Sequence, residues 1–123
     1  MGKKSKNSPL VEVPRQEIER LEDLYSFRGR EEVTEFLESH SFLVLLLLEA
    51  YPHVKRHFGS DAPVFLEVVT DPEATNDREL YALIGTRLPP EAALEKLERF
   101  DKEWWSAAMD RAQCKLCIDV GFV

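Results

Sequence analysis

The chain lacks most of the features that identify secreted and membrane proteins. It has two cysteines among 123 residues, too few for the disulfide framework of a small secreted domain. Its longest apolar run is Phe42–Leu48, whereas crossing a bilayer takes about 20 residues. Residues 1–13 contain no apolar signal-peptide core. These absences predict a cytoplasmic protein with no membrane segment.

Recognisable catalytic and cofactor motifs are missing as well. The sequence contains no catalytic triad pattern, no glycine-rich phosphate loop and no HExxH-type motif. The glycines that could shape a loop are isolated, namely Gly29, Gly59, Gly85 and Gly121. The sequence therefore indicates no cofactor and does not favour an enzyme.

Positive charge is scarce outside the N-terminal segment. The net charge is −7, and residues 1–13 carry three lysines and one glutamate, so the remainder of the chain sums to −9. Nucleic acids bind through Lys and Arg, which neutralise phosphates. The charge therefore disfavours a nucleic-acid ligand and favours a basic protein partner.

What is present is the composition of a folded domain, with 44% hydrophobic and 32% charged residues. Residues 1–13 mix Lys, Ser, Asn and Pro without a period and predict a flexible tail. Residues 14–123 predict a single domain, in line with their length.

Helical periodicity dominates the first half of the chain and returns near its end. Together with proline and glycine boundaries, it predicts helices over residues 14–29, 30–40, 41–58 and 90–112. Pro52 lies inside the third helix and predicts a kink or a break there. Phe42–Leu48 is apolar on every side, which is typical of a buried helix.

Three segments have the composition of strands: Val64–Val69, Glu79–Thr86 and Lys115–Phe122. We expect the first two to form an antiparallel hairpin, and the first, as the most apolar, to lie in the middle. The predicted fold class is α+β. N-terminal helices precede a β-β-α-β arrangement, in which helices cover one face of a three-stranded, mainly antiparallel sheet.

Acidic residues surround the predicted hairpin: Glu67, Asp71, Glu73, Asp77 and Glu79. Converging carboxylates can bind a hard cation or transfer protons, whereas a solvated turn needs neither. Glu67 interrupts an apolar strand, so it lies on an exposed face or is buried with a partner. Glu67, Asp71 and Glu73 are the candidate catalytic residues of a small metal-dependent hydrolase.

Two histidines, His53 and His57, are spaced by four residues, and Glu49 precedes them by four. On a straight helix the three would share a face, as metal ligands often do. Pro52 disturbs that alignment, and basic side chains near a helix C-terminus stabilise it without a metal. We favour that stabilising role, with a metal site at His53 and His57 as the alternative. His40 is expected to be a hydrogen-bonded core histidine.

Cys114 and Cys117 have the CxxC spacing of zinc and redox sites. The second ligand pair that a zinc site needs is missing, and residues three apart in a strand point to opposite faces. We interpret both as small core residues, with metal or redox use as the alternative.

The adjacent tryptophans differ in their expected position. A helical stripe predicts that Trp104 is buried, together with Ala93, Leu97, Phe100 and Ala107. Trp105 is turned about 100° away, beside Asp101 and Met109. Aromatic residues dominate binding interfaces, so Trp105, Met109 and Asp101 are candidate partner-binding residues. For Trp105 we favour closing the core, with binding to a partner as the alternative.

Most of the chain from Arg28 onward carries a recognisable combination of segments: REEVTEFLESHSFLVLLLLEAY, FLEVVTDPE, PPEAALEKLERFDKEWW and KLCIDVGF. Together they resemble a family of small bacterial proteins of unknown function. The resemblance implies a bacterial, cytoplasmic protein and assigns no activity, ligand or catalytic residue.

These observations favour a non-enzymatic accessory protein that binds a second copy of itself or a basic partner. The hypothesis depends on the apolar surface around Leu43–Leu48, on Trp105 and on the missing catalytic motifs. The metal-dependent hydrolase described above is one alternative. A binder of a small apolar ligand, with Trp104 and Phe65 lining its pocket, is another.

Overall fold

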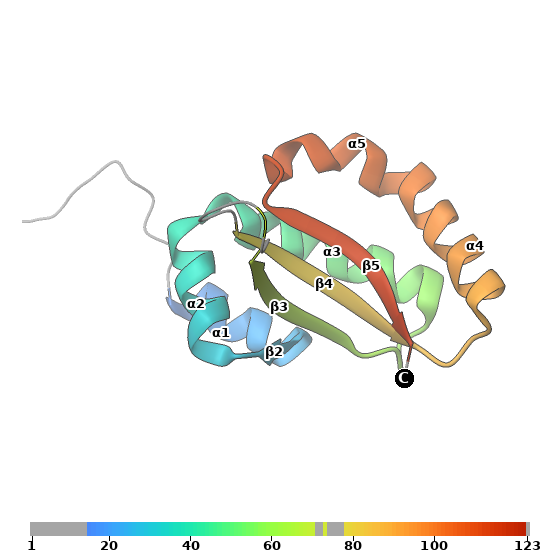
Figure 1. Cartoon of the computed structure of the whole chain (residues 1–123), viewed down its shortest axis with the longest axis horizontal. Coiled ribbons are helices and arrows are strands. Elements are labelled where there is room, and N and C mark those ends of the chain that lie inside the picture. The colour runs from blue at the N-terminus through green and yellow to red at the C-terminus, as the bar shows by residue number, and fades with distance from the viewer. Residues whose placement is uncertain (1–14, 71–72, 74–77, 123) are drawn as a thin grey trace, which may run out of the picture.

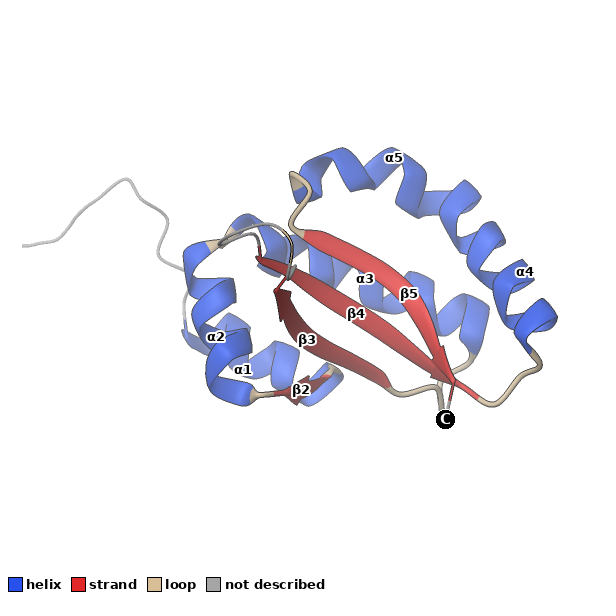
Figure 2. Cartoon of the chain, viewed as in Figure 1, coloured by secondary structure: helices blue, strands red, loops and turns tan. Residues whose placement is uncertain are grey.

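The computed structural model describes residues 15–70, 73 and 78–122, so the expected tail, Asp71 and Asp77 lie outside the described residues. The fold is mixed α and β (Figures 1 and 2). Its first half contains α1 (Arg15–Leu24), β2 (Ser26–Arg28), α2 (Arg30–Ser39) and α3 (Phe42–Phe58). The strands β3 (Val64–Thr70) and β4 (Arg78–Thr86) follow. The chain then forms α4 (Pro90–Phe100), the π-helical turn η1 (Asp101–Trp105), α5 (Ser106–Ala108), the 3₁₀ turn η2 (Met109–Ala112) and β5 (Leu116–Phe122).

The sheet has four strands in the order β2-β3-β4-β5, so the expectation of three strands was wrong. The β3–β4 hairpin is antiparallel, as expected, but β2–β3 and β4–β5 are parallel. Two of the three pairings therefore contradict a mainly antiparallel sheet. Among the three strands that the sequence predicts, β4 rather than β3 lies in the middle, and β2 supplies the second neighbour of β3.

The parallel pairings follow from the connections between strands. Helices α2 and α3 link β2 to β3, and the helical segment from α4 to η2 links β4 to β5. A helical crossover returns the chain to the same end of the sheet, so the two strands that it joins run in the same direction.

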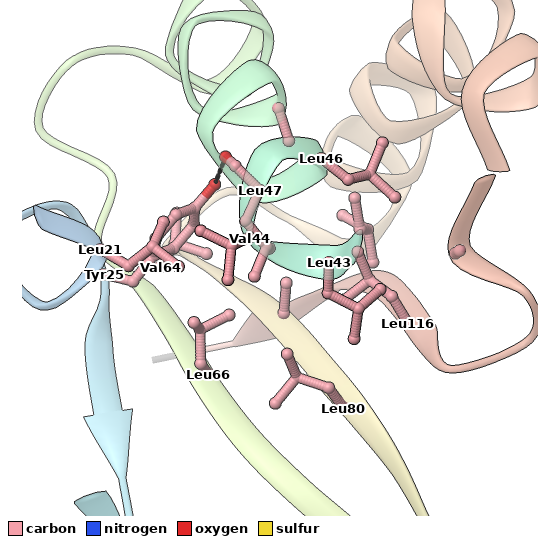
Figure 3. Close-up of a cluster of buried hydrophobic side chains, with 14 of the residues drawn as sticks. Leu21, Tyr25, Leu43, Val44, Leu46, Leu47, Val64, Leu66, Leu80 and Leu116 are labelled. Carbon is pink, nitrogen blue, oxygen red and sulfur yellow. Dashed lines mark hydrogen bonds between the residues drawn. The ribbon is translucent and has the colours of Figure 1, made fainter. Parts of the chain in front are cut away.

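The core lies between α3 and one face of the sheet. In Figure 3 Leu43 and Val44 of α3 point toward the strands that carry Leu66 and Leu80, and the side chains of Leu66 and Leu80 are fully buried. Complete burial of one such side chain contributes roughly 1.5–3 kcal/mol. The apolar run of α3 is thus largely buried, as predicted, except for Leu45, which is 64% exposed.

Helix α3 continues past Pro52 without a break and ends at Phe58. The preceding α2 ends at Ser39, and the next residue, His40, donates a hydrogen bond from Nδ1 to the Phe36 carbonyl at 2.9 Å. The His40 ring also stacks on Phe36. His40 is hydrogen-bonded, as expected, although it is only partly buried.

Side chains alternate between the two faces of the sheet, as the period of a strand requires. One set is buried against the helices: Val64, Leu66, Leu80, Ala82, Ile84, Leu116 and Ile118. The intervening residues of the three longer strands point to the opposite side and are mostly half-buried. Among the described residues, no helix is long and apolar enough to cross a bilayer.

Candidate functional site

The π-helical turn η1 changes which residues of the last helical segment are buried. Hydrogen bonds in a π-helix span five residues instead of four, so the turn accommodates one extra residue. The apolar stripe starts at Ala93, Leu97 and Phe100, as predicted. After the turn it continues one residue later than expected, at Trp105, Ala108 and Ala112.

Trp104, predicted to be buried, is only partly buried, and Trp105 takes the buried position, which is the role that we favoured for it. Trp105 belongs to the core and is 6% exposed, so it does not present a surface for a partner. Trp104 is half-buried and stacks on His53, with ring centroids 4.8 Å apart and planes at 13°. Met109 is 48% exposed, and Asp101 is half-buried.

The histidines of α3 and the preceding glutamate have separate partners. His57 Nε2 lies 2.8 Å from Glu103 Oε2, and His53 stacks on Trp104 as described above. Glu49 accepts two hydrogen bonds from Arg111, which hold the pKa of this exposed carboxyl below its ordinary value. The structure does not bring the three together, and within the described ranges no group of three or more His, Cys, Asp or Glu could hold a metal ion.

Among the described residues of the hairpin, the carboxylates likewise form no group that could hold a metal ion. Glu67 lies on the strand surface opposite Tyr81 and accepts a hydrogen bond from Arg28 Nη1 at 3.4 Å. The guanidinium of Arg28 also lies 4.3 Å from the centre of the Phe65 ring. Glu73 is exposed. Glu67 therefore lies on the strand surface and is paired with Arg28 of β2, a strand that the sequence did not predict.

The face of the sheet opposite α3 carries a mixed set of side chains, which we call the second sheet face. Cross-strand register aligns Phe65 with Leu83 and Asp119, and Glu67 with Tyr81 and Cys117. The register also aligns Val69 with Glu79. The face therefore consists of Phe65, Glu67, Val69, Glu79, Tyr81, Leu83, Cys117 and Asp119. Period-two alternation within β4 was the sequence signal for Tyr81 and Leu83.

Negative charge is concentrated around Cys117. Burial raises the pKa of this thiol, and Glu79, Asp119 and Asp101 raise it further. Burial also raises the pKa of the Asp101 carboxyl, with additional repulsion from Asp119 and Glu98. A cation close to these groups would relieve this repulsion.

The two cysteines do not act as the pair of core residues that we expected. Cys114 is exposed in the turn before β5 and has a positive φ of 62°. Cys117 is half-buried on the second sheet face. Their environments differ because the turn precedes the strand, and neither side chain belongs to the core.

The fold and the second sheet face define a small α+β protein with a four-stranded mixed sheet and an acidic, partly apolar surface. The chain matches no family model, no curated protein and no solved structure. Its resemblance to a bacterial family therefore stays a prediction.

Proposed function

We propose that this protein is a cytoplasmic accessory protein that binds a basic protein partner through the second sheet face. We also propose that all helices lie on one side of the sheet, so that the second sheet face has no helical layer over it. In Figure 1 the strands β3, β4 and β5 run in front of α3, and no labelled helix crosses in front of them. A sheet face without a covering layer is a natural surface for a partner.

The apolar part of the second sheet face supports binding to a protein. Phe65, Tyr81 and Leu83 lie on adjacent positions of β3 and β4 and are half-buried. Val69 is 37% exposed beside them. Aromatic side chains near the centre of a surface, with polar groups at its rim, are typical of protein interfaces.

The charges of the second sheet face support a basic partner over a second copy of the chain. Glu67, Glu79 and Asp119 lie on the second sheet face, and Asp101 is close enough to raise the pKa of Cys117. Arg28, a cation beside this face, is already paired with Glu67. Two copies joined through it would bring like charges together, which is unfavourable. Charge complementarity therefore favours a basic partner over a second copy.

The single observation that carries the proposal is the coincidence of half-buried aromatic side chains and concentrated carboxylates on one sheet face. It is tested by affinity capture from bacterial lysate with the wild-type chain and with a Leu83→Arg, Asp119→Lys double variant. The control carries Leu94→Arg and Glu95→Lys, which make similar changes at exposed positions of α4. Circular dichroism checks that each variant is folded.

We expect the wild type and the control to retain the same protein with a basic isoelectric point. The double variant should lose it, and higher salt should weaken retention, because surface charges are screened. In a Cys114→Ser background, the purified partner should also slow the alkylation of Cys117. Equal retention by the double variant, or unchanged Cys117 alkylation, contradicts the proposal. A stable dimer in light scattering that the double variant disrupts would replace it with self-association.

A further inference from the structure

The molecule has a hollow at the end of β4, next to the Phe65 end of the second sheet face, because a Cβ at Gly85, which lines the hollow, would lie 3.3 Å from the Phe65 ring. Its volume is about 690 Å³, within the range of roughly 300–1,000 Å³ that is usual for small-molecule sites. The residues that line it come from the end of α3, the loop before β3, the turn after β4 and α4. We infer that this hollow binds a small organic monoanion with an apolar body, such as a medium-chain carboxylate.

One wall of the hollow is held in place by hydrogen bonds within the α3–β3 loop. Lys55 Nζ donates to the carbonyl of Ser60 at 3.3 Å and to the carbonyl of Ala62. The Pro63 carbonyl accepts a hydrogen bond of 2.7 Å from the Gly85 N–H on β4. A Cβ at position 85 would lie 2.9 Å from Pro63 Cγ, so only glycine permits this close contact.

The turn after β4, which forms the other wall of the hollow, is also held by a hydrogen bond. The buried Thr86 accepts a hydrogen bond at Oγ1 from the Leu88 N–H at 3.1 Å. Because both walls are held by internal hydrogen bonds, a ligand would not have to order them on binding, and preorganisation of this kind favours affinity.

The hollow is lined by apolar side chains and by more positive than negative charges. Phe58, Pro63 and Leu88 supply apolar surface, while Arg87 and Lys96 are cations and Asp61 is an acid. Arg87 and Lys96 form no ion pair or hydrogen bond with any described residue. Their charges are therefore available to a ligand.

The balance of these charges selects the class of anion. Arginine binds a carboxylate through two parallel hydrogen bonds, and lysine adds a second charge-assisted donor. Asp61 repels further negative charge, which disfavours a phosphate dianion relative to a monoanionic carboxylate. The apolar residues favour a ligand with a hydrocarbon body over a free inorganic anion.

The test uses the full chain and NMR titrations of backbone amides with octanoate, octanamide and inorganic phosphate. We expect octanoate to shift the amides of Phe58, Gly85 and Leu88. Octanamide, which has the same chain without the charge, should bind about tenfold more weakly or worse, since a charged hydrogen bond contributes roughly 1.5–3 kcal/mol.

An Arg87→Gln, Lys96→Gln variant should lose about tenfold or more in octanoate affinity. The matched control, Arg99→Gln with Lys102→Gln, changes exposed cations of the same helical segment and should bind as the wild type does. The remaining amide signals show whether each variant is folded.

The inference would be overturned if octanoate did not bind, or if it shifted the amides of other residues. It would also be overturned if octanamide bound as tightly as octanoate, or if phosphate bound more tightly. The inference is independent of the proposed partner. The Leu83→Arg, Asp119→Lys variant is expected to keep its octanoate affinity, so failure of one proposal is distinguishable from failure of the other.

Discussion

Cys117 is the residue whose reactivity reports most directly on the second sheet face. Its thiol is half-buried on β5, and three carboxylates raise its pKa in addition to burial. A thiol with a raised pKa forms less thiolate at a given pH, and the thiolate is the nucleophile. The rate at which Cys117 reacts with a disulfide reagent therefore reports on the negative charge around its thiol, because that charge raises the thiol pKa.

We predict that Asp119→Asn accelerates the reaction of Cys117 with a disulfide reagent at pH 8. The measurement uses a Cys114→Ser background, so that Cys117 is the reacting thiol. Removing one carboxylate lowers the thiol pKa, and because one pKa unit is a tenfold change in thiolate, we expect an increase of about two- to tenfold. Asparagine keeps an oxygen that can accept the Val120 N–H hydrogen bond. The control, Asp23→Asn on α1, should leave the rate unchanged, and an equally unchanged rate in Asp119→Asn contradicts the prediction.

Tyr25 is a polar residue of the core that joins α1 to α3. Its hydroxyl donates a buried hydrogen bond of 2.7 Å to the carbonyl of Leu47 (Figure 3). Burial raises the pKa of the phenol, and Tyr51 raises it further. The folded state therefore favours the neutral phenol, which donates this hydrogen bond.

Tyr25→Phe should lower the free energy of unfolding by about 1–2 kcal/mol at pH 7, because the Leu47 carbonyl loses a buried partner. In the wild type the folded pKa lies above the unfolded value near 10. The contribution of Tyr25 is thus complete below about pH 10 and is lost as pH rises further. Urea denaturation between pH 7 and pH 11 should show a steeper alkaline loss of stability in the wild type than in Tyr25→Phe. Parallel curves would show that Tyr25 is not the titrating group.

At the scale of elements, η1 is the feature that sets the register of the last helical segment. It lets Trp105 enter the core while Trp104 stacks on His53 and Glu103 reaches His57. Single π-helical turns are known to occur often at functional positions. The turn therefore places Trp105 in the core and, in the same five residues, brings Trp104 and Glu103 to the histidines of α3.

Deleting Lys102 should convert η1 into a regular α-helical turn while keeping Phe100, Trp105 and Ala108 on one face. We expect the free energy of unfolding to change by no more than about 1 kcal/mol, which is the central size of mutational effects. The near-ultraviolet circular dichroism of the tryptophans should change, because the stack of Trp104 on His53 is lost.

The matched control deletes Glu95, an exposed residue in the regular part of α4. That deletion rotates one part of the stripe by about 100° and should remove Phe100 or Ala93 from the core, at a cost of about 3 kcal/mol or more for the phenylalanine. Equal destabilisation by the two deletions, measured by urea denaturation, would contradict the role of η1.

At the scale of the whole molecule, the two proposed sites occupy different parts of the fold. The second sheet face is formed by the middle of β3, β4 and β5, whereas the hollow lies where β4 ends and α4 begins. The first is acidic, and the second has two cations and one acid. A net charge of −7 therefore coexists with a local site for an anion, because charge is distributed unevenly over the surface.

The sequence by itself determined the α+β class, the β3–β4 hairpin and the burial of most of α3. Each of these depends on a pattern within a short contiguous segment, such as the leucines around Leu46 or the alternation in β4. Such patterns state which side of an element is apolar, and burial of that side follows from the hydrophobic effect.

Only the tertiary structure decided β2, the parallel pairings, the partial exposure of Trp104, and the pairing of Glu67 with Arg28. A three-residue strand is too short to show a period, and it becomes a strand because β3 supplies its hydrogen bonds. The extra residue in η1 accompanies contacts between η1 and α3, such as the stack of Trp104 on His53. These features come from groups that are distant in sequence, so no local pattern could specify them.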